Sequence, residues 1–219
     1  MSRDPQLVIF DCDGVLVDSE VISNGVLAEM LSAEGLPTTL MQARRNYQGL
    51  LLADVLARAE GRLGRALPND WLAGFERERA KAFQRELEPV AGAATAVQRL
   101  TAAGVLVCVA SQGKLSKTRL SLALTGLDRL FPDEARFSAE SVARGKPAPD
   151  LFLHAAEAMG SGPASCVVVE DTPSGVTAAV SAGMRAFGYV ADSDEAALRR
   201  AGAEILRSLG ELPARLGVA

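Results

Sequence analysis

The sequence predicts an α/β fold, in which a doubly wound, Rossmann-like parallel sheet forms the core and an α-helical cap domain is inserted into it. Two observations predict this fold: short apolar runs alternate with helical segments over most of the chain, and one long helical stretch interrupts the alternation after the first run. Alternating strands and helices are typical of parallel sheets, because a helix usually connects two parallel strands. A chain of 219 residues, 48% of them hydrophobic and 23% charged, is long enough to bury such a core.

Buried strands are expected where a short apolar run ends in polar residues. Three such runs comprise residues 7–10, 105–110 and 166–169. Asp11, Ser111 and Glu170 follow them directly. In an open parallel sheet, ligands bind outside the carboxyl ends of the strands, so these polar residues are expected to line one crevice.

Helices are expected between the strands, and each one stops at a glycine. They comprise Ala93–Ala103, Lys114–Thr125, Pro149–Met159 and Ser174–Ala182. A glycine just beyond a helix end accepts the left-handed conformation that closes the helix. A further strand is expected at Arg185–Val190, and a short edge strand at Ala203–Ile205.

The stretch between the first two strands is rich in Leu, Ala, Glu and Arg and contains no convincing strand. Apolar residues such as Val21, Leu27 and Leu31 recur in it at helical spacing. We therefore expect a helical cap domain at residues 18–87 and an α/β core formed by residues 1–17 and 88–219.

Composition and charge exclude several classes of protein. A net charge of −4 without a basic stripe argues against nucleic acid as the main partner. The longest apolar runs are strand-sized, far short of the roughly 20 residues that cross a bilayer. Residues 1–5 lead directly into the first strand with no signal peptide, so a cytoplasmic location is expected. No obligate protein partner is evident.

The cysteines and the histidine also limit the chemistry. Cys12, Cys108 and Cys166 lie in or beside the expected core strands without metal-site spacing, which is typical of buried, reduced thiols. His154 is the single histidine and is expected to be structural. Serine-histidine triads and multi-histidine zinc sites are therefore excluded as the main chemistry.

The pair Asp11 and Asp13 is the most informative feature of the chain. Residues two apart on an extended backbone point to the same side, so both carboxylates can face one reaction centre while Cys12 faces away. Alone, the pair also fits a helix cap or a turn.

The surrounding motifs resemble those of a known family. Residues 11–20, with the sequence DCDGVLVDSE, resemble the first motif of the haloacid dehalogenase-like hydrolases, in the branch with a helical cap after the first strand. Ser111 matches the second motif, Lys146 the third, and the Glu170-Asp171 pair the fourth. The order of the motifs and the position of the cap also agree, so the resemblance spans nearly the whole chain.

The resemblance implies phosphoryl transfer. Asp11 is then the nucleophile that forms an aspartyl phosphate, and Asp13 is the general acid and base. Lys146 supplies a catalytic positive charge. The transferring phosphoryl group would be held by residues of the first and second motifs, namely Ser111, Gln112 and the closely approaching backbone of Gly14 and Gly113.

A cation is expected because a phosphate dianion would meet four carboxylates. One like-charge pair at 4 Å repels by about 4 kcal/mol at an effective dielectric near 20. Magnesium suits an all-oxygen site. The resemblance implies that Asp11, the backbone carbonyl of Asp13 and Asp171 bind Mg²⁺, with Glu170 binding it either directly or through water.

Substrate specificity is expected in the cap, because the core motifs contact only the phosphate. Gln48 and Gly49 lie in a cap turn that resembles the substrate-contacting segment of related enzymes, and Arg44 and Arg45 could recognise a sugar acid. The expected substrate is a small phosphorylated metabolite, either a sugar phosphate or a phosphorylated sugar acid.

Three alternatives to a phosphatase are open at this point. Sugar-phosphate mutases of this family carry a histidine shortly after the first motif, where Ser23 stands here, so hydrolysis is favoured. A phosphoryl-accepting signalling domain would be smaller and would lack the cap. A haloacid dehalogenase does not need Asp13 or a metal.

Overall fold

The computed structural model describes residues 5–190 and 193–218, and the chain divides into two compact units. The core unit comprises Met1–Val17 and Pro89–Ala219. The helical unit comprises Asp18–Glu88, which nearly coincides with the stretch in which the sequence shows no strand. Among the described residues, no helix combines the length and apolar composition that crossing a bilayer requires.

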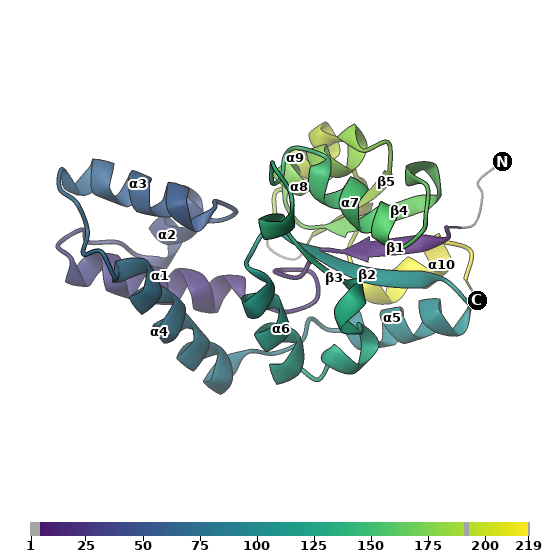
Figure 1. Cartoon of the computed structure of the whole chain (residues 1–219), viewed down its shortest axis with the longest axis horizontal. Coiled ribbons are helices and arrows are strands. Elements are labelled where there is room, and N and C mark those ends of the chain that lie inside the picture. The colour runs from purple at the N-terminus through teal and green to yellow at the C-terminus, as the bar shows by residue number, and fades with distance from the viewer. Residues whose placement is uncertain (1–4, 191–192, 219) are drawn as a thin grey trace. The chain divides into compact units, whose positions relative to one another are not determined.

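A six-stranded parallel sheet forms the centre of the core unit (Figure 1). Its strands are β1 (Leu7–Phe10), β2 (Leu106–Ser111), β3 (Arg136–Ser138), β4 (Cys166–Glu170), β5 (Arg185–Tyr189) and β6 (Glu204–Leu206). Their order is β3-β2-β1-β4-β5-β6, so the chain winds outward on one side of β1 and then on the other. The predicted doubly wound α/β fold is confirmed. The change of direction at β1 is the place where such sheets bind ligands.

Helices cover both faces of this sheet (Figure 1). They are α5 (Ala93–Ala102), α6 (Leu115–Leu124), α7 (Asp150–Ala158), α8 (Pro173–Ser181), α9 (Glu195–Ala201) and α10 (Leu212–Arg215). Short 3₁₀ helices are η1 (Asp128–Leu130), η2 (Asp133–Ala135), η3 (Ala139–Ser141), η4 (Pro163–Ser165) and η5 (Leu209–Glu211). The helices α7, α8 and α9 lie on one face of the sheet, with α5, α6 and α10 on the other.

The glycine-terminated helices of the core are confirmed. The glycine after each one has a positive φ between 68° and 81°; these are Gly104, Gly126, Gly160 and Gly183. Only glycine adopts this left-handed conformation without strain, which explains why the sequence marks the helix ends so clearly.

The sequence does not predict β3, α9, α10 or the short 3₁₀ helices. The edge strand β3 has only three residues, too few for an alternating pattern to be recognised. The helix α9 spans seven residues and is capped by Asp194, whose side chain accepts bonds from the N–H groups of Ala196 and Ala197.

The core strands are buried because helices pack on both of their sides. All four residues of β1 and all five of β4 are buried, which explains their continuous apolar runs. Cys12, Cys108 and Cys166 are buried and form no disulfide, as the sequence predicts. His154 packs edge-on against Phe137, with 5.6 Å between the ring centroids.

The helical unit consists of four helices around its own apolar core. They are α1 (Glu20–Ala33), α2 (Leu40–Tyr47), α3 (Leu52–Leu63) and α4 (Trp71–Glu86). Leu27 and Leu31 of α1 are buried in this core, and Trp71 stacks on Phe75 within α4. Thr39 and Gln42 form a reciprocal capping box at the start of α2.

Candidate active site

Polar residues gather at the carboxyl ends of three neighbouring strands. Asp11 follows β1 directly, Ser111 ends β2 and Glu170 ends β4. Because β1 lies between β2 and β4, the three side chains start from adjacent positions along one edge of the sheet. The backbone N–H of Asp11 donates to the carbonyl of Val169 at 2.9 Å, which fixes the start of the first loop.

Lys146 joins the ends of all three strands. Its Nζ lies 2.6 Å from Asp11 Oδ1, 2.6 Å from Glu170 Oε1 and 3.1 Å from the carbonyl oxygen of Ala110 in β2. An ammonium group has three donors, and these acceptors can satisfy all of them. The Lys146 side chain is only 4% exposed, so this is a buried charge with full hydrogen bonding.

Burial and the opposite charges determine which of these groups are ionised. Burial raises the pKa of Asp11 to about 7, with Lys146 opposing the rise and Glu170 and Asp13 adding to it. Burial also opposes the charge of Lys146, but Asp11 and Glu170 outweigh it and raise the pKa of Lys146 above its usual value. The lysine therefore stays positively charged at the centre of an acidic cluster.

Both oxygens of Glu170 accept hydrogen bonds from the protein. Oε1 accepts from Lys146, and Oε2 accepts from the backbone N–H groups of Asp171 and Thr172 and from the Thr172 hydroxyl at 2.8–2.9 Å. The Thr172 oxygen in turn accepts from the N–H of Gly175 and caps α8. Glu170 thus fixes the position of Lys146 and of the first turn of α8.

The first motif loop lies against Asp171. Gly14 has a φ of 76°, and a methyl group added there would overlap the Asp171 carboxylate. Only glycine fits both the conformation and the space. The Asp171 carboxylate is therefore held next to the backbone that follows Asp13.

The second motif borders the site and also binds the backbone of Lys146. Gln112 Oε1 accepts a hydrogen bond from the backbone N–H of Lys146 at 2.9 Å, and a side chain at Gly145 would overlap the Gln112 amide. Ser111 is buried, and its Oγ accepts from the N–H of Gly113 at 3.1 Å. The Gln112 side chain thus anchors the loop that carries Lys146.

Sequence reasoning missed two residues of this cluster. Lys117 forms an ion pair with Asp13, and Thr172 donates its hydroxyl to Glu170. Lys117 could have been found from its place in the first turn of the helix that follows Ser111. Thr172 could have been found because a threonine followed by a proline is typical of a helix start.

The remaining predicted site residues, Gln48 and Gly49, lie in the helical unit after α2. Arg44 Nε donates to Gln48 Oε1 at 3.4 Å, and Gly49 has a φ of 77°. Tyr47 is 2% exposed, and its hydroxyl accepts from Arg62 at 3.1 Å, so Tyr47 belongs to the core of the helical unit.

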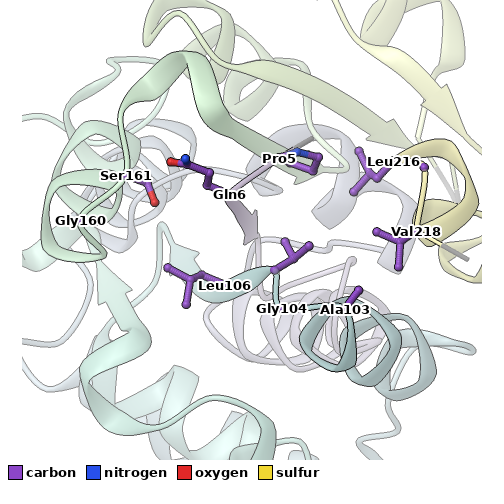
Figure 2. Close-up of a pocket in the computed structure, with 11 residues that line it drawn as sticks. Pro5, Gln6, Ala103, Gly104, Leu106, Gly160, Ser161, Leu216 and Val218 are labelled. Atoms are coloured by element: carbon purple, nitrogen blue, oxygen red, sulfur yellow. The ribbon is translucent and has the colours of Figure 1, made fainter. Parts of the chain in front are cut away.

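A separate pocket lies at the opposite end of the sheet. It is lined by residues that precede β1 and begin β2, and Figure 2 shows the Gln6 and Leu106 side chains there with Ser161 nearby. These positions are at the amino ends of the strands. The pocket therefore does not include the acidic cluster.

A parallel sheet with an aspartate pair after one strand, a serine at the end of the next, and a buried lysine bound to the first aspartate is suited to phosphoryl transfer. Residues 5–183 match the family model of the haloacid dehalogenase-like hydrolases. The chain belongs to this family, and it is an enzyme of the phosphatase type. This finding decides against the signalling-domain alternative.

Three relatives illustrate the similarity. The chain is 32% identical to 6-phosphogluconate phosphatase of Escherichia coli K12 over 188 residues, which cover 85% of this chain and 83% of the relative. It is 42% identical to β-phosphoglucomutase of Mycobacterium tuberculosis over 119 residues, covering 50% and 44%. The crystal structure of a HAD family hydrolase from Deinococcus radiodurans R1 with bound phosphate and sodium has a TM-score of 0.81 at 33% identity, covering 98% and 96%.

Proposed function

We propose that this phosphatase is magnesium-dependent and hydrolyses a small phosphorylated metabolite, a sugar phosphate or phosphorylated sugar acid, through an aspartyl phosphate on Asp11. The observation that carries the proposal is the buried ammonium of Lys146, bound to Asp11 and Glu170 at 2.6 Å. A buried lysine held at a nucleophile by a second carboxylate is suited to attract and neutralise a phosphoryl group.

Two successive displacements account for the reaction. Asp11 Oδ attacks phosphorus while the bond to the leaving oxygen breaks, and Asp13 gives that oxygen its proton. Water then attacks phosphorus, the bond to Asp11 breaks, and Asp13 takes a proton from the water. Ser111 and nearby backbone N–H groups would hold the phosphoryl oxygens through both steps.

The donor set suits magnesium. No three acidic, imidazole or thiol side chains among the described residues form a metal-type group, but this site needs only two carboxylates, Asp11 and Asp171, together with the carbonyl of Asp13. The close approach of Gly14 to the Asp171 carboxylate supports this proposal, because it places Asp171 next to the backbone that follows Asp13. When bound, magnesium would neutralise charge on the phosphate. Since both oxygens of Glu170 already accept protein hydrogen bonds, we propose that Glu170 contacts magnesium through a water molecule and not directly.

The relatives and the helical unit support the proposed substrate class. The similar Escherichia coli enzymes are named 6-phosphogluconate phosphatase and hexitol phosphatase A. We propose that residues 18–87 act as a cap in which Gln48 and Gly49 contact the organic part of the substrate. Arg44 and Arg45 would favour an acidic sugar.

A phosphomutase remains the second candidate. The partial similarity to β-phosphoglucomutase favours it, whereas the absence of a histidine between residues 11 and 153 favours hydrolysis. Product analysis separates the two, because a mutase would convert β-glucose 1-phosphate to glucose 6-phosphate faster than it released phosphate.

The direct test is phosphate release from a panel of sugar phosphates by the wild type, Asp11→Asn and the surface control Asp128→Asn. We expect the wild type and Asp128→Asn to hydrolyse at least one member of the panel. We expect Asp11→Asn to fold but to lose turnover, and to lack the phosphoryl adduct that the wild type forms on the peptide containing residue 11. Near-normal hydrolysis by purified Asp11→Asn would disprove the assignment.

A further inference from the structure

Lys117 is a second cation in the acidic cluster. It lies in the first turn of α6, and its ammonium forms an ion pair with Asp13. The two side chains are 12% and 18% exposed, whereas the surface pair Lys81 and Glu78 is 60% and 51% exposed. Screening by water weakens an exposed pair, so the pair with Asp13 is expected to hold its geometry better than a surface pair does.

The stem of Lys117 also borders the site. A methyl group added at Gly113 would lie 3.4 Å from Lys117 Cδ, 3.5 Å from Ser111 Oγ and 4.0 Å from Asp13 Oδ2. The α-carbon of Gly113 therefore faces a small space surrounded by these three side chains. Lys117 approaches Asp13 from the β2 side of the sheet.

Asp11 and Asp13 thus each have their own lysine. Lys146 binds Asp11, and Lys117 binds Asp13. The two lysines come from different segments, the loop before α7 and the first turn of α6. The two carboxylates repel each other, so separate cations keep each in a defined orientation.

We propose that Lys117 is a positioning residue for Asp13, which holds this carboxyl group in the orientation needed to give a proton to the leaving oxygen. The inference rests on the proposed phosphatase function, because it requires Asp13 to be the acid. In that step the bond from Asp11 to phosphorus forms, the bond to the leaving oxygen breaks, and the Asp13 proton moves to that oxygen. Lys117 touches Asp13 and takes no part in the bonds that change.

A positioning role differs measurably from direct phosphate binding. An alkoxide leaves poorly and needs a proton from Asp13, whereas p-nitrophenolate leaves readily without one. Loss of the orientation of Asp13 should therefore slow alkyl phosphates much more than p-nitrophenyl phosphate. Loss of a phosphate contact would slow both equally and weaken the binding of inorganic phosphate.

The experiment compares the wild type with Lys117→Met, Lys117→Arg and Arg119→Met. Arg119 lies on the same helix in an exposed pair with Asp133, so its replacement removes one positive charge without touching the cluster. The value of kcat/KM is measured for the best alkyl phosphate of the panel and for p-nitrophenyl phosphate, because kcat/KM reports cleavage of the first bond. Inhibition by inorganic phosphate and the thermal melting of each variant are measured alongside.

For Lys117→Met we expect kcat/KM on the alkyl phosphate to fall by about 10- to 100-fold, and on p-nitrophenyl phosphate by less than about 3-fold. The inhibition constant of inorganic phosphate should stay within about 2-fold of the wild type, since the phosphate site is retained. Lys117→Arg should recover part of the loss, and Arg119→Met should behave as wild type.

Equal losses on both substrates, unchanged kinetics in a folded Lys117→Met variant, or a clear rise of the inhibition constant would each overturn the inference. Failure of the proposed function has a different signature: a wild type that hydrolyses no phosphate monoester, or an Asp11→Asn variant that remains active.

Discussion

The contact between Gly175 and Glu170 gives the sharpest prediction of the structure. Gly175 lies in the first turn of α8, and a methyl group added there would overlap both the carboxyl carbon and Oε1 of Glu170. Glu170 is 1% exposed and is held by Lys146 and by three donors in residues 171–172. The substitution Gly175→Ala must therefore displace either Glu170 or the start of α8.

The magnitude follows from two opposing contributions. Replacing a helical glycine by alanine normally stabilises by about 0.5–1 kcal/mol. Overpacking a tight site costs typically 1–3 kcal/mol, and each lost hydrogen bond to a charged group costs about 1.5–3 kcal/mol. If Glu170 loses one of its bonds, the net destabilisation is about 1.5–5.5 kcal/mol, or between about 3 and 22 °C in melting temperature for a chain of this size.

The assay combines thermal melting with phosphate release. Gly61→Ala in α3 is the matched control, because Gly61 is also helical and nothing lies within 4 Å of the added methyl group. We expect Gly61→Ala to melt at or above the wild-type temperature with unchanged turnover. We expect Gly175→Ala to melt lower and to lose at least about 10-fold in kcat/KM, since Lys146 loses the partner that positions it.

A Gly175→Ala variant that melts like Gly61→Ala would refute this reasoning. It would mean that Glu170 can move without loss, and that the hydrogen bonds on its carboxylate contribute little to the site. Reduced stability with full activity would refute only the second step, the dependence of Lys146 on Glu170.

Two further predictions concern the metal and the second motif. Chelation should abolish phosphate release and magnesium should restore it. Calcium should substitute poorly because of its looser coordination. The substitution Asp171→Asn should raise the magnesium concentration for half-maximal activity by at least about 10-fold. Full activity in excess chelator, with no metal found by elemental analysis, would contradict the proposed site. Gln112→Ala should lower stability by about 1 kcal/mol, because the Lys146 N–H loses its acceptor. It should also reduce kcat/KM for all substrates alike, and a change in their ranking would instead indicate direct contact with the organic part of the substrate.

The parts of the fold that were predictable have a strong local cause. The buried strand β1 is apolar along its whole length and β4 is apolar up to its last residue, Glu170, and glycines such as Gly104 and Gly183 mark helix ends through their own backbone conformation. The strand β3 could not be predicted, because a three-residue edge strand is defined by its pairing with β2 and not by a pattern of its own.

The site likewise contains residues that the sequence predicts and residues that it does not. Asp11 and Glu170 stand at the ends of recognisable strands, so their convergence follows from the topology. The pairing of Lys117 with Asp13 depends on the exact direction of α6, and the contact of Gln112 with Lys146 depends on the path of a loop. Neither has a spacing rule, because side chains brought together by tertiary packing leave no periodic signal in the sequence.

The charge pairing also determines which substitutions can separate catalysis from stability. Lys146→Met would leave Asp11 and Glu170 buried without their cation, and breaking a buried pair costs about 3–5 kcal/mol. A loss of activity in Lys146→Met could therefore reflect either unfolding or the loss of a catalytic group. Asp11→Asn acts in the opposite direction: it removes one negative charge from an acidic cluster, and Lys146 keeps its ion pair with Glu170 and its hydrogen bond to Ala110. A folded but inactive Asp11→Asn protein is therefore the physically expected outcome, and it tests the nucleophile more cleanly than any variant of the lysine.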